Sequence, residues 1–226
     1  MIRVHVICEG QTEEAFVHEL LVPWFNEYEI KLTPRLIGKP GHKGGRVNCA
    51  RLFEDVQLLL NDKSAYCTTL IDYYGMENDV PGKVEADRLP TPAAKAACLT
   101  TAIRSSLQRE LGEKYAAAMQ RFIPYVQLHE FEALLFSDPE RLARGIFRND
   151  LADRFQTIRN AFATPENIND SPLTAPAKRI SRLVPDYEKP LYGSLAALEI
   201  GLEAMRRECA LFRDWMDGLA ALPPLN

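Results

Sequence analysis

The chain has 226 residues, of which 46% are hydrophobic and 26% are charged, and these proportions are ordinary for a soluble globular protein. Its net charge is −4 at pH 7, so any contact with nucleic acid would need a local basic patch. The five scattered cysteines form no CxxC pair, which argues against a disulfide framework and a zinc site. Without a signal peptide or a long apolar run, we expect a cytoplasmic protein that does not contact membranes.

The first apolar run of the chain ends in an acid. Residues 4–8 are predicted to form a buried strand, and Glu9 and Gly10 follow it directly. Thr12 is expected to cap a helix that extends to about Asn26. In an open α/β sheet, ligands bind outside the carboxyl ends of the strands, so Glu9 is a candidate functional acid.

The same alternation of strands and helices continues to about residue 137. Strands are predicted over residues 30–37, 65–71 and 122–128, and helices over residues 48–60, 92–111 and 133–136, with an irregular insertion over residues 76–92. This order predicts a Rossmann-like α/β fold with a mainly parallel sheet of about four strands. We assign residues 1–137 to this domain and residues 138–226, where prolines separate helical stretches, to a helical extension packed on it. The pattern leaves open whether that extension forms a separate lobe or a helical cover for the sheet.

Three of the four predicted strands end in acids, which are Glu9, Asp72 and the pair Glu130 and Glu132. Because the ends of parallel strands share one edge, these side chains are expected to converge. Buried carboxylates repel one another unless a cation neutralises them or one is protonated. Their hard oxygen atoms suit Mg²⁺ or Mn²⁺, which can support phosphodiester cleavage. The alternative is that they are solvent-facing polar residues at strand ends.

The fourth strand end offers two further choices. His129 is a candidate general acid–base group or ligand, or alternatively a hydrogen-bonded histidine at the sheet edge. If the strand continues, Glu130 and Glu132 point to one side, whereas in a helix they diverge by about 200°. We favour Glu130 as the participant.

Two basic segments are candidates for binding nucleic acid. Lys39, Lys43 and Arg46 lie in a glycine-rich loop that could contact phosphate groups, although no Walker pattern is present. Lys178 and Arg179, with Arg182 and Lys189 nearby, form the second basic group. For both segments, the alternative is a solvated surface.

These acids stand in motifs that resemble a known family. Glu9-Gly10-Gln11-Thr12-Glu13 resembles the EGxTE element of Toprim domains, especially the nuclease domains of the overcoming-lysogenization-defect type. Together with segments 72–75, 129–136 and 171–179, it makes most of the chain similar to an uncharacterised bacterial family of unknown function. That family is placed near Toprim folds and is often encoded beside ATPases.

The resemblance implies a Toprim-like fold with divalent metal at Glu9, Asp72 and Glu13. Toprim domains usually carry Asp-x-Asp at the end of the third strand, and here Tyr74 stands in place of the second acid. One ligand is therefore lost, and the candidates to replace it are Glu130, Glu132, Glu77 and Asp79.

We therefore expect a Mg²⁺- or Mn²⁺-dependent nuclease or related phosphoryl-transfer enzyme, the effector partner of an ATPase in defence against mobile DNA. Glu9, Asp72, Glu130 and His129 would be its catalytic residues. One alternative is a non-catalytic module that binds a partner protein or a nucleotide. Another is receiver-like phosphotransfer on Asp72, which would need a nearby lysine at a strand end. The substrate and the oligomeric state stay open.

Overall fold

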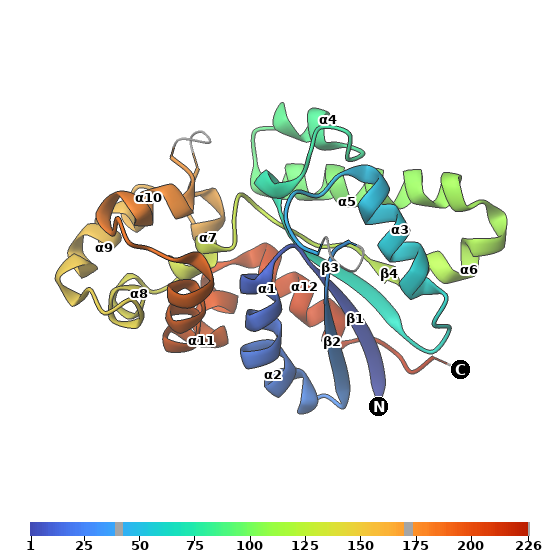
Figure 1. Ribbon diagram of the computed structural model, residues 1–226, viewed down its shortest axis with the longest axis horizontal. Coiled ribbons are helices and arrows are strands. Elements are labelled where there is room, and N and C mark those ends of the chain that lie inside the picture. Colours follow the sequence, from blue (N-terminus) through green and yellow to red (C-terminus); the bar gives the residue numbers. More distant parts are fainter. Residues whose placement is uncertain (39–42, 170–173, 226) are drawn as a thin grey trace.

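The computed structural model describes residues 1–38, 43–169 and 174–225, and it shows a parallel five-stranded sheet flanked by helices (Figure 1). The strands are β1 (Ile2–Cys8), β2 (Ile30–Leu36), β3 (Tyr66–Asp72), β4 (Phe122–Ile123) and β5 (Val126–Gln127). Their order is β2-β1-β3-β4, and β5 also pairs with β3. Every pairing is parallel, which confirms the predicted α/β class and the mainly parallel sheet.

The helices of the first 137 residues are α1 (Gln11–Phe16), α2 (Val22–Asn26), α3 (Cys49–Leu60), α4 (Lys83–Asp87), α5 (Pro92–Leu111), α6 (Ala116–Met119) and α7 (Glu132–Leu135). Those that follow are α8 (Pro139–Gly145), α9 (Ala152–Asn160), α10 (Pro176–Leu183), α11 (Ser194–Glu208) and α12 (Ala210–Ala220). Short 3₁₀ turns occur at Tyr73–Gly75, Glu113–Tyr115, Asn149–Leu151 and Pro165–Asn167. Within the described residues, no helix is both long and apolar enough to cross a bilayer.

The two faces of the sheet belong to two separate apolar clusters. Val4, Val6 and Cys8 of β1 pack with α1, α2 and the C-terminal helices, whereas Ile7 packs with α3 and α5 on the opposite face. This division follows from the alternation of side chains along a strand. All seven residues of β3 are buried, as expected for a central strand of a parallel sheet that is covered on both faces.

The predicted fourth strand is two short strands, which is why the sheet has five. Pro124 lies between β4 and β5 and has no backbone N–H to donate to a sheet ladder. The side chain of Thr69 in β3 fills this gap, because its Oγ1 accepts from Tyr125 N at 2.9 Å and donates to the Tyr125 carbonyl at 2.6 Å. Polar pairing with β3 therefore continues past the proline.

The first helical segment differs from its prediction at its start. It runs from Gln11 to Asn26 as α1, a π-helical turn η1 (Val17–Leu21) and α2, so the predicted end is confirmed. The expectation that Thr12 caps the helix is wrong, because the extended Gly10 is the N-cap and Thr12 is buried inside the first turn. The π-helical turn ends two residues before Pro23, the second residue of α2, whose missing N–H interrupts the regular α-helical bonding.

The last helix packs against the sheet. The indole Nε1 of Trp215 in α12 donates to Thr68 Oγ1 in β3 at 2.9 Å, and its ring stacks on Tyr125 with centroids 4.5 Å apart. Figure 1 shows α8, α9, α10 and α11 gathered beyond α1 and α2, on the side away from α3 and α5. The segment that joins α10 to α11 passes the carboxyl ends of the strands, where the candidate site lies.

Candidate functional site

The turns that follow β1 and β3 meet at Glu9. Its Oε2 accepts a hydrogen bond from the backbone N–H of Asp72 at 3.0 Å. A Cβ atom at Gly75 would lie 2.1 Å from that same oxygen, so the carboxylate of Glu9 occupies space that only a glycine leaves open. The predicted convergence of Glu9 and Asp72 is therefore present in the structure.

Lys189 provides a cation among the acids. Its Nζ lies 3.0 Å from Asp72 Oδ2, 3.3 Å from Glu132 Oε2 and 3.4 Å from Glu13 Oε1. The lysine begins the π-helical turn η6 (Lys189–Gly193), which precedes α11. We call Glu9, Glu13, Asp72 and Glu132, together with Lys189, the carboxylate cluster.

The acids of the carboxylate cluster are shielded from solvent. Glu13 is 2% exposed, Asp72 is 3% exposed and Glu132 is 0% exposed. Three buried carboxyl groups therefore share one ammonium group, with the half-buried Glu9 beside them, in a place where an uncompensated charge is costly. Protonation of an acid or a further cation would reduce that cost.

The pKa values in the carboxylate cluster reflect this imbalance. Burial, followed by repulsion from Asp72 and Glu13, raises the pKa of Glu9 to about 8. Burial raises the pKa of Glu132 to about 7, although Lys189 opposes this shift, and burial also raises the pKa of Glu13. Burial lowers the pKa of Lys189, but the nearby carboxylates outweigh it and raise that pKa well above its ordinary value. The ammonium group therefore stays charged.

Several buried oxygen atoms of the carboxylate cluster are incompletely paired. Within the described residues, Asp72 Oδ1 and Glu132 Oε1 accept no hydrogen bond, and Glu13 Oε1 and Glu132 Oε2 have only the ion pairs with Lys189. Such hard oxygen donors are the type that Mg²⁺ or Mn²⁺ prefers. As they are arranged, however, no three Asp, Glu, His or Cys side chains in the described part of the chain are placed to hold a metal ion. The carboxylate oxygen atoms are of the type that binds a divalent cation, but in this structure they are arranged around the Lys189 ammonium group.

Glu130, the favoured member of its pair, lies beside the carboxylate cluster. Its Oε2 accepts from the backbone N–H of Ala177 at 2.9 Å, at the start of α10. Burial raises the pKa of Glu130. Glu132 is the member that contacts Lys189, because α7 begins at Glu132 and the alternation of an extended strand no longer applies.

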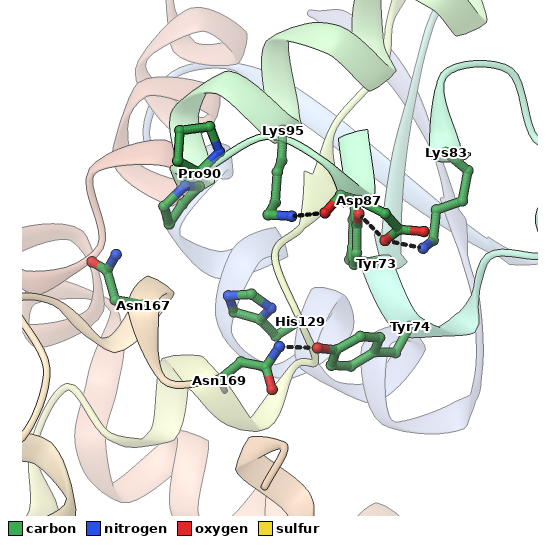
Figure 2. Close-up of a pocket in the computed structure, with 10 residues that line it drawn as sticks. Tyr73, Tyr74, Lys83, Asp87, Pro90, Lys95, His129, Asn167 and Asn169 are labelled. Carbon is green, nitrogen blue, oxygen red and sulfur yellow. Dashed lines mark hydrogen bonds and ion pairs between the residues drawn. The ribbon is translucent and has the colours of Figure 1, made fainter. Parts of the chain in front are cut away.

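His129 faces a different space from the acids. With a φ of 69°, its backbone turns the chain between β5 and α7. The imidazole lines a pocket of about 560 Å³ beside Tyr73 and Tyr74, and the pocket lining contains no acid of the carboxylate cluster (Figure 2). Burial, followed by the charge of Lys95, lowers the pKa of His129 to about 4, so its ring is neutral at pH 7. We call this space the polar pocket.

Tyr74, which replaces the expected second acid, also belongs to the polar pocket. Its hydroxyl accepts a hydrogen bond from the side-chain amide of Asn169, and its ring lies 5.8 Å from that of His129. Burial raises the pKa of Tyr74 to about 12. The residue at this position therefore lines a pocket instead of adding a carboxylate.

The two basic segments lie in different surroundings. Lys39 is outside the described residues, while Lys43 and Arg46 are exposed. Their loop contacts the first turn through its backbone, because the N–H of Gly45 donates to the carbonyl of Glu9 at 3.1 Å.

In α10, Lys178 is near enough to Glu130 to lower the pKa of that acid. Arg179 packs its guanidinium 5.0 Å from the centre of the Phe162 ring and donates to the Thr174 carbonyl at 2.7 Å. Arg179 is therefore engaged within the protein.

The sequence reasoning missed the position of Lys189. The lysine was only one of several cations in the second basic group, and no local pattern links it to Asp72, from which it is separated by 117 residues. It also stands close to Asp72, as the receiver-like alternative requires, but on a helical turn and not at a strand end. The available local signal was Pro190, because the residue before a proline is biased away from the helical region and often marks an element boundary.

Comparisons with curated proteins and with solved structures found no match. A family model covers residues 8–220, which include every residue of the carboxylate cluster and of the polar pocket. The chain therefore belongs to the family described as "Domain of unknown function (DUF4276)".

Proposed function

We propose that the carboxylate cluster is the active site of a Toprim-like, divalent-metal-dependent nuclease or related phosphoryl-transfer enzyme. The observation that carries this proposal is the excess of buried acids over donors at the carboxyl ends of β1 and β3. Glu9, Glu13 and Asp72 would hold Mg²⁺ or Mn²⁺, with Glu130 or Glu132 completing the set. The bound ion would supply Lewis acidity and orient a phosphate group.

Glu9 is positioned to act as a ligand of the ion. Its Oε2 accepts from the Asp72 N–H, and the carboxylate lies in the space that Gly75 leaves open. Without an ion the pKa of Glu9 is raised to about 8, so at pH 7 a cation would displace a proton when it binds there. Metal affinity should therefore increase with pH.

Lys189 would bind the substrate's phosphate. Its side chain is 35% exposed, and its ammonium group contacts three acids. A lysine is a compact point charge that can stabilise the negative charge on a transferring phosphoryl group. We assign it this role in addition to neutralising the carboxylate cluster.

The setting of the enzyme follows from the resemblance in the motifs at residues 9–13, 72–75 and 129–136. In this proposal the protein is cytoplasmic and acts as the effector partner of an ATPase in defence against mobile DNA. His129 contributes from the polar pocket, and the cations at Lys39, Lys43, Arg46, Lys178 and Arg179 attract the nucleic acid backbone.

A second candidate is a non-catalytic module that binds a partner protein or a nucleotide. Two observations favour it. Lys189 already neutralises part of the carboxylate cluster, and no three acids in the described residues are spaced as metal ligands. In this case the ion pairs would dock η6 and α11 onto the sheet.

Cleavage assays separate the two candidates. Plasmid, single-stranded DNA and RNA are incubated with Mg²⁺, Mn²⁺ or EDTA, with and without the cognate ATPase. Wild type is compared with Glu9→Gln, Asp72→Asn and Lys189→Met. The matched controls are the exposed positions Glu27→Gln, Asp153→Asn and Lys114→Met. We expect metal-dependent cleavage that falls about 10²-fold or more in each cluster variant, the loss typical of a missing group that stabilises the transition state, and that persists in the controls.

Two outcomes would argue against the enzyme. Cleavage that survives in both Glu9→Gln and Asp72→Asn would mean that the activity comes from elsewhere. A folded wild-type protein that cleaves none of these substrates, even with the ATPase, would favour the binding module. Melting temperature supplies an independent readout, because Mg²⁺ should raise it in wild type and not in Asp72→Asn.

A further inference from the structure

The polar pocket adjoins the carboxylate cluster through two short stretches of chain. Asp72, the last residue of β3, contacts Lys189 in the cluster, while the next two residues, Tyr73 and Tyr74, line the pocket. After β5, His129 lines the pocket and Glu132 contacts Lys189. Residues that line the pocket and candidate catalytic acids are therefore close neighbours along these two stretches of chain.

The walls of the polar pocket include flat, apolar surfaces. The Tyr74 and His129 rings are inclined at 39° with centroids 5.8 Å apart, and Pro90 and Pro92 line another part (Figure 2). Surfaces of this kind stack on the faces of nucleic acid bases. The volume of about 560 Å³ lies within the range of small-ligand sites, which is about 300–1,000 Å³.

The polar pocket also carries a small excess of positive charge. Lys83 Nζ donates to Asp87 Oδ1 at 2.8 Å, and Lys95 Nζ donates to the carbonyls of Ala86 and Asp87 at 2.9 and 3.3 Å. Lys83 is 6% exposed and its Nζ lies 4.0 Å from the centre of the Tyr73 ring, whereas Lys95 is half-buried and keeps one of its three N–H donors for a ligand. Two ammonium groups against one carboxylate, with a neutral imidazole, leave one net charge, which complements a single phosphodiester.

Hydrogen-bonding groups with a defined direction complete the lining. Asn167 accepts from the Thr164 hydroxyl through Oδ1 at 2.7 Å, which leaves its amide nitrogen as a donor at the pocket. His129 Nδ1 is buried and has no hydrogen-bond partner within the described residues, in a side chain that belongs to a 5% exposed residue. This nitrogen is closed off from the pocket, so His129 contributes ring surface to the lining and no hydrogen bond from Nδ1.

We propose that the polar pocket holds one unstacked nucleotide of a single-stranded nucleic acid, with its base against Tyr74 and His129 and its phosphate at Lys95. As a statement about substrate class, this inference rests on the proposed nuclease function. As a statement about binding, it rests on the pocket alone. Single-stranded nucleic acid is recognised through this combination of ring stacking and cationic contacts to the backbone.

Binding without metal tests the inference separately from catalysis. The probe is a fluorescein-labelled single-stranded DNA of about ten nucleotides, a length within typical single-strand site sizes, measured by anisotropy in EDTA. The variants are Tyr74→Ala, Tyr74→Phe, His129→Asn and Lys95→Met. Asparagine is chosen at position 129 because it tolerates the positive φ. Exposed Tyr28→Ala and Lys114→Met are the matched controls, and every variant is checked for folding by its melting temperature.

We expect Tyr74→Ala and His129→Asn each to weaken binding about tenfold, within the range for loss of one base-stacking contact. Tyr74→Phe should bind within about twofold of wild type, because the ring is kept. Lys95→Met should reduce the slope of log affinity against log salt by about 0.7, as expected for one lost phosphate contact on a single strand. The controls should bind as wild type does.

The source of the nucleotide is tested by competition. Deoxynucleoside monophosphates that compete only at much higher concentration than the oligonucleotide would support a strand. Equal competition would instead identify a free nucleotide as the ligand and overturn the strand. Unchanged binding in folded Tyr74→Ala and His129→Asn, equally strong binding of a duplex, or equal competition by inorganic phosphate would also overturn the inference.

Failure of this inference and failure of the proposed enzyme give different results. Metal-dependent cleavage in the pocket variants at wild-type rate and KM, with no pocket-dependent binding, would support the nuclease and reject the pocket as its substrate site. Pocket-dependent binding that persists in Glu9→Gln, with no cleavage by wild type, would support the binding site and reject the nuclease.

Discussion

Carboxylates at the two ends of the sheet have pKa values that are shifted in opposite directions. At the amino end, Asp62 accepts hydrogen bonds from Arg3, from the Ser64 hydroxyl at 2.9 Å and from the Ser64 backbone at 3.2 Å, and His5 Nε2 lies 3.3 Å from it. These contacts outweigh its slight burial and lower the pKa of Asp62 to about 2. At the carboxyl end, acids outnumber donors, and the pKa of Glu9 is raised to about 8.

The contrast shows that the number of donors, more than the number of acids, separates a structural ion pair from a candidate site. Asp62 accepts hydrogen bonds from Arg3 and Ser64, so its charge is offset without a proton or a bound cation. The carboxylate cluster keeps buried oxygen atoms without donors, so protons or a cation must offset its charge. Perturbed pKa values of this kind are typical of functional sites.

Removing the lysine should have the largest effect on stability. Lys189→Met would leave Asp72, Glu132 and Glu13 without their cation. Breaking a fully buried pair costs about 3–5 kcal/mol, and we expect about 2–3 kcal/mol here because the Lys189 side chain is 35% exposed. Urea denaturation of the metal-free protein at pH 8 measures it.

The contrasting variant is Glu132→Gln, which removes a negative charge and keeps the shape. It should cost less than Lys189→Met and should recover part of the loss when the two are combined. A Lys189→Met protein as stable as wild type would mean that the acids are already neutral, and it would remove the main difference between the two ends of the sheet.

The second-largest difference between the two ends of the sheet should be the pH dependence of folding stability. Glu9 has a pKa of about 8 in the folded protein and 4.5 as its ordinary value, and Glu132 has about 7 against 4.5. The folded state therefore binds more protons between these values, so the stability from these two groups falls as pH rises from about 4.5 to 8. The raised pKa of Lys189 acts only above its ordinary value of 10.5 and does not affect this window.

Denaturation of the metal-free protein from pH 6.5 to 8 tests this sign, because below pH 6.5 the lowered pKa of His129 makes stability rise with pH. Glu9→Gln should flatten the fall, because it removes the group with the larger shift. Asp62 acts in the opposite direction and at lower pH, since its stabilisation is lost as pH falls from 3.8 through about 2. Wild-type stability that rises steadily from pH 6.5 to 8 would contradict the assignment of raised pKa values to the carboxylate cluster.

The smallest effect is expected at the amino end itself. Asp62→Asn removes an ion pair with Arg3 whose side chains are 29% and 44% exposed. Exposed pairs contribute about 0.2–1 kcal/mol, so the free energy of unfolding should fall by less than about 1 kcal/mol at pH 7. Its cleavage and oligonucleotide binding should match wild type, and a large loss of either would place a functional site at this end too.

Local patterns were sufficient to predict much of the fold. The buried runs before Glu9 and Asp72 have the composition of strands, and their alternation with helical periodicity predicts a parallel sheet. Parallel pairing then places both acids at one edge, as observed. The break of the fourth strand at Pro124 was also visible in the residue type, because proline cannot donate to a ladder.

Tertiary contacts decided the composition of the site. Lys189 reaches Asp72 only because α10 and α11 pack so that η6 crosses the strand ends, and no local spacing encodes a contact over 117 residues. The positive φ of His129 likewise turns its imidazole into the polar pocket, although it is only three residues from Glu132 in the cluster. Periodicity reports which face of an element is buried, whereas charge compensation depends on which distant segment is packed against that face. For this reason the acids could be predicted from the sequence, and the cation that they share could not.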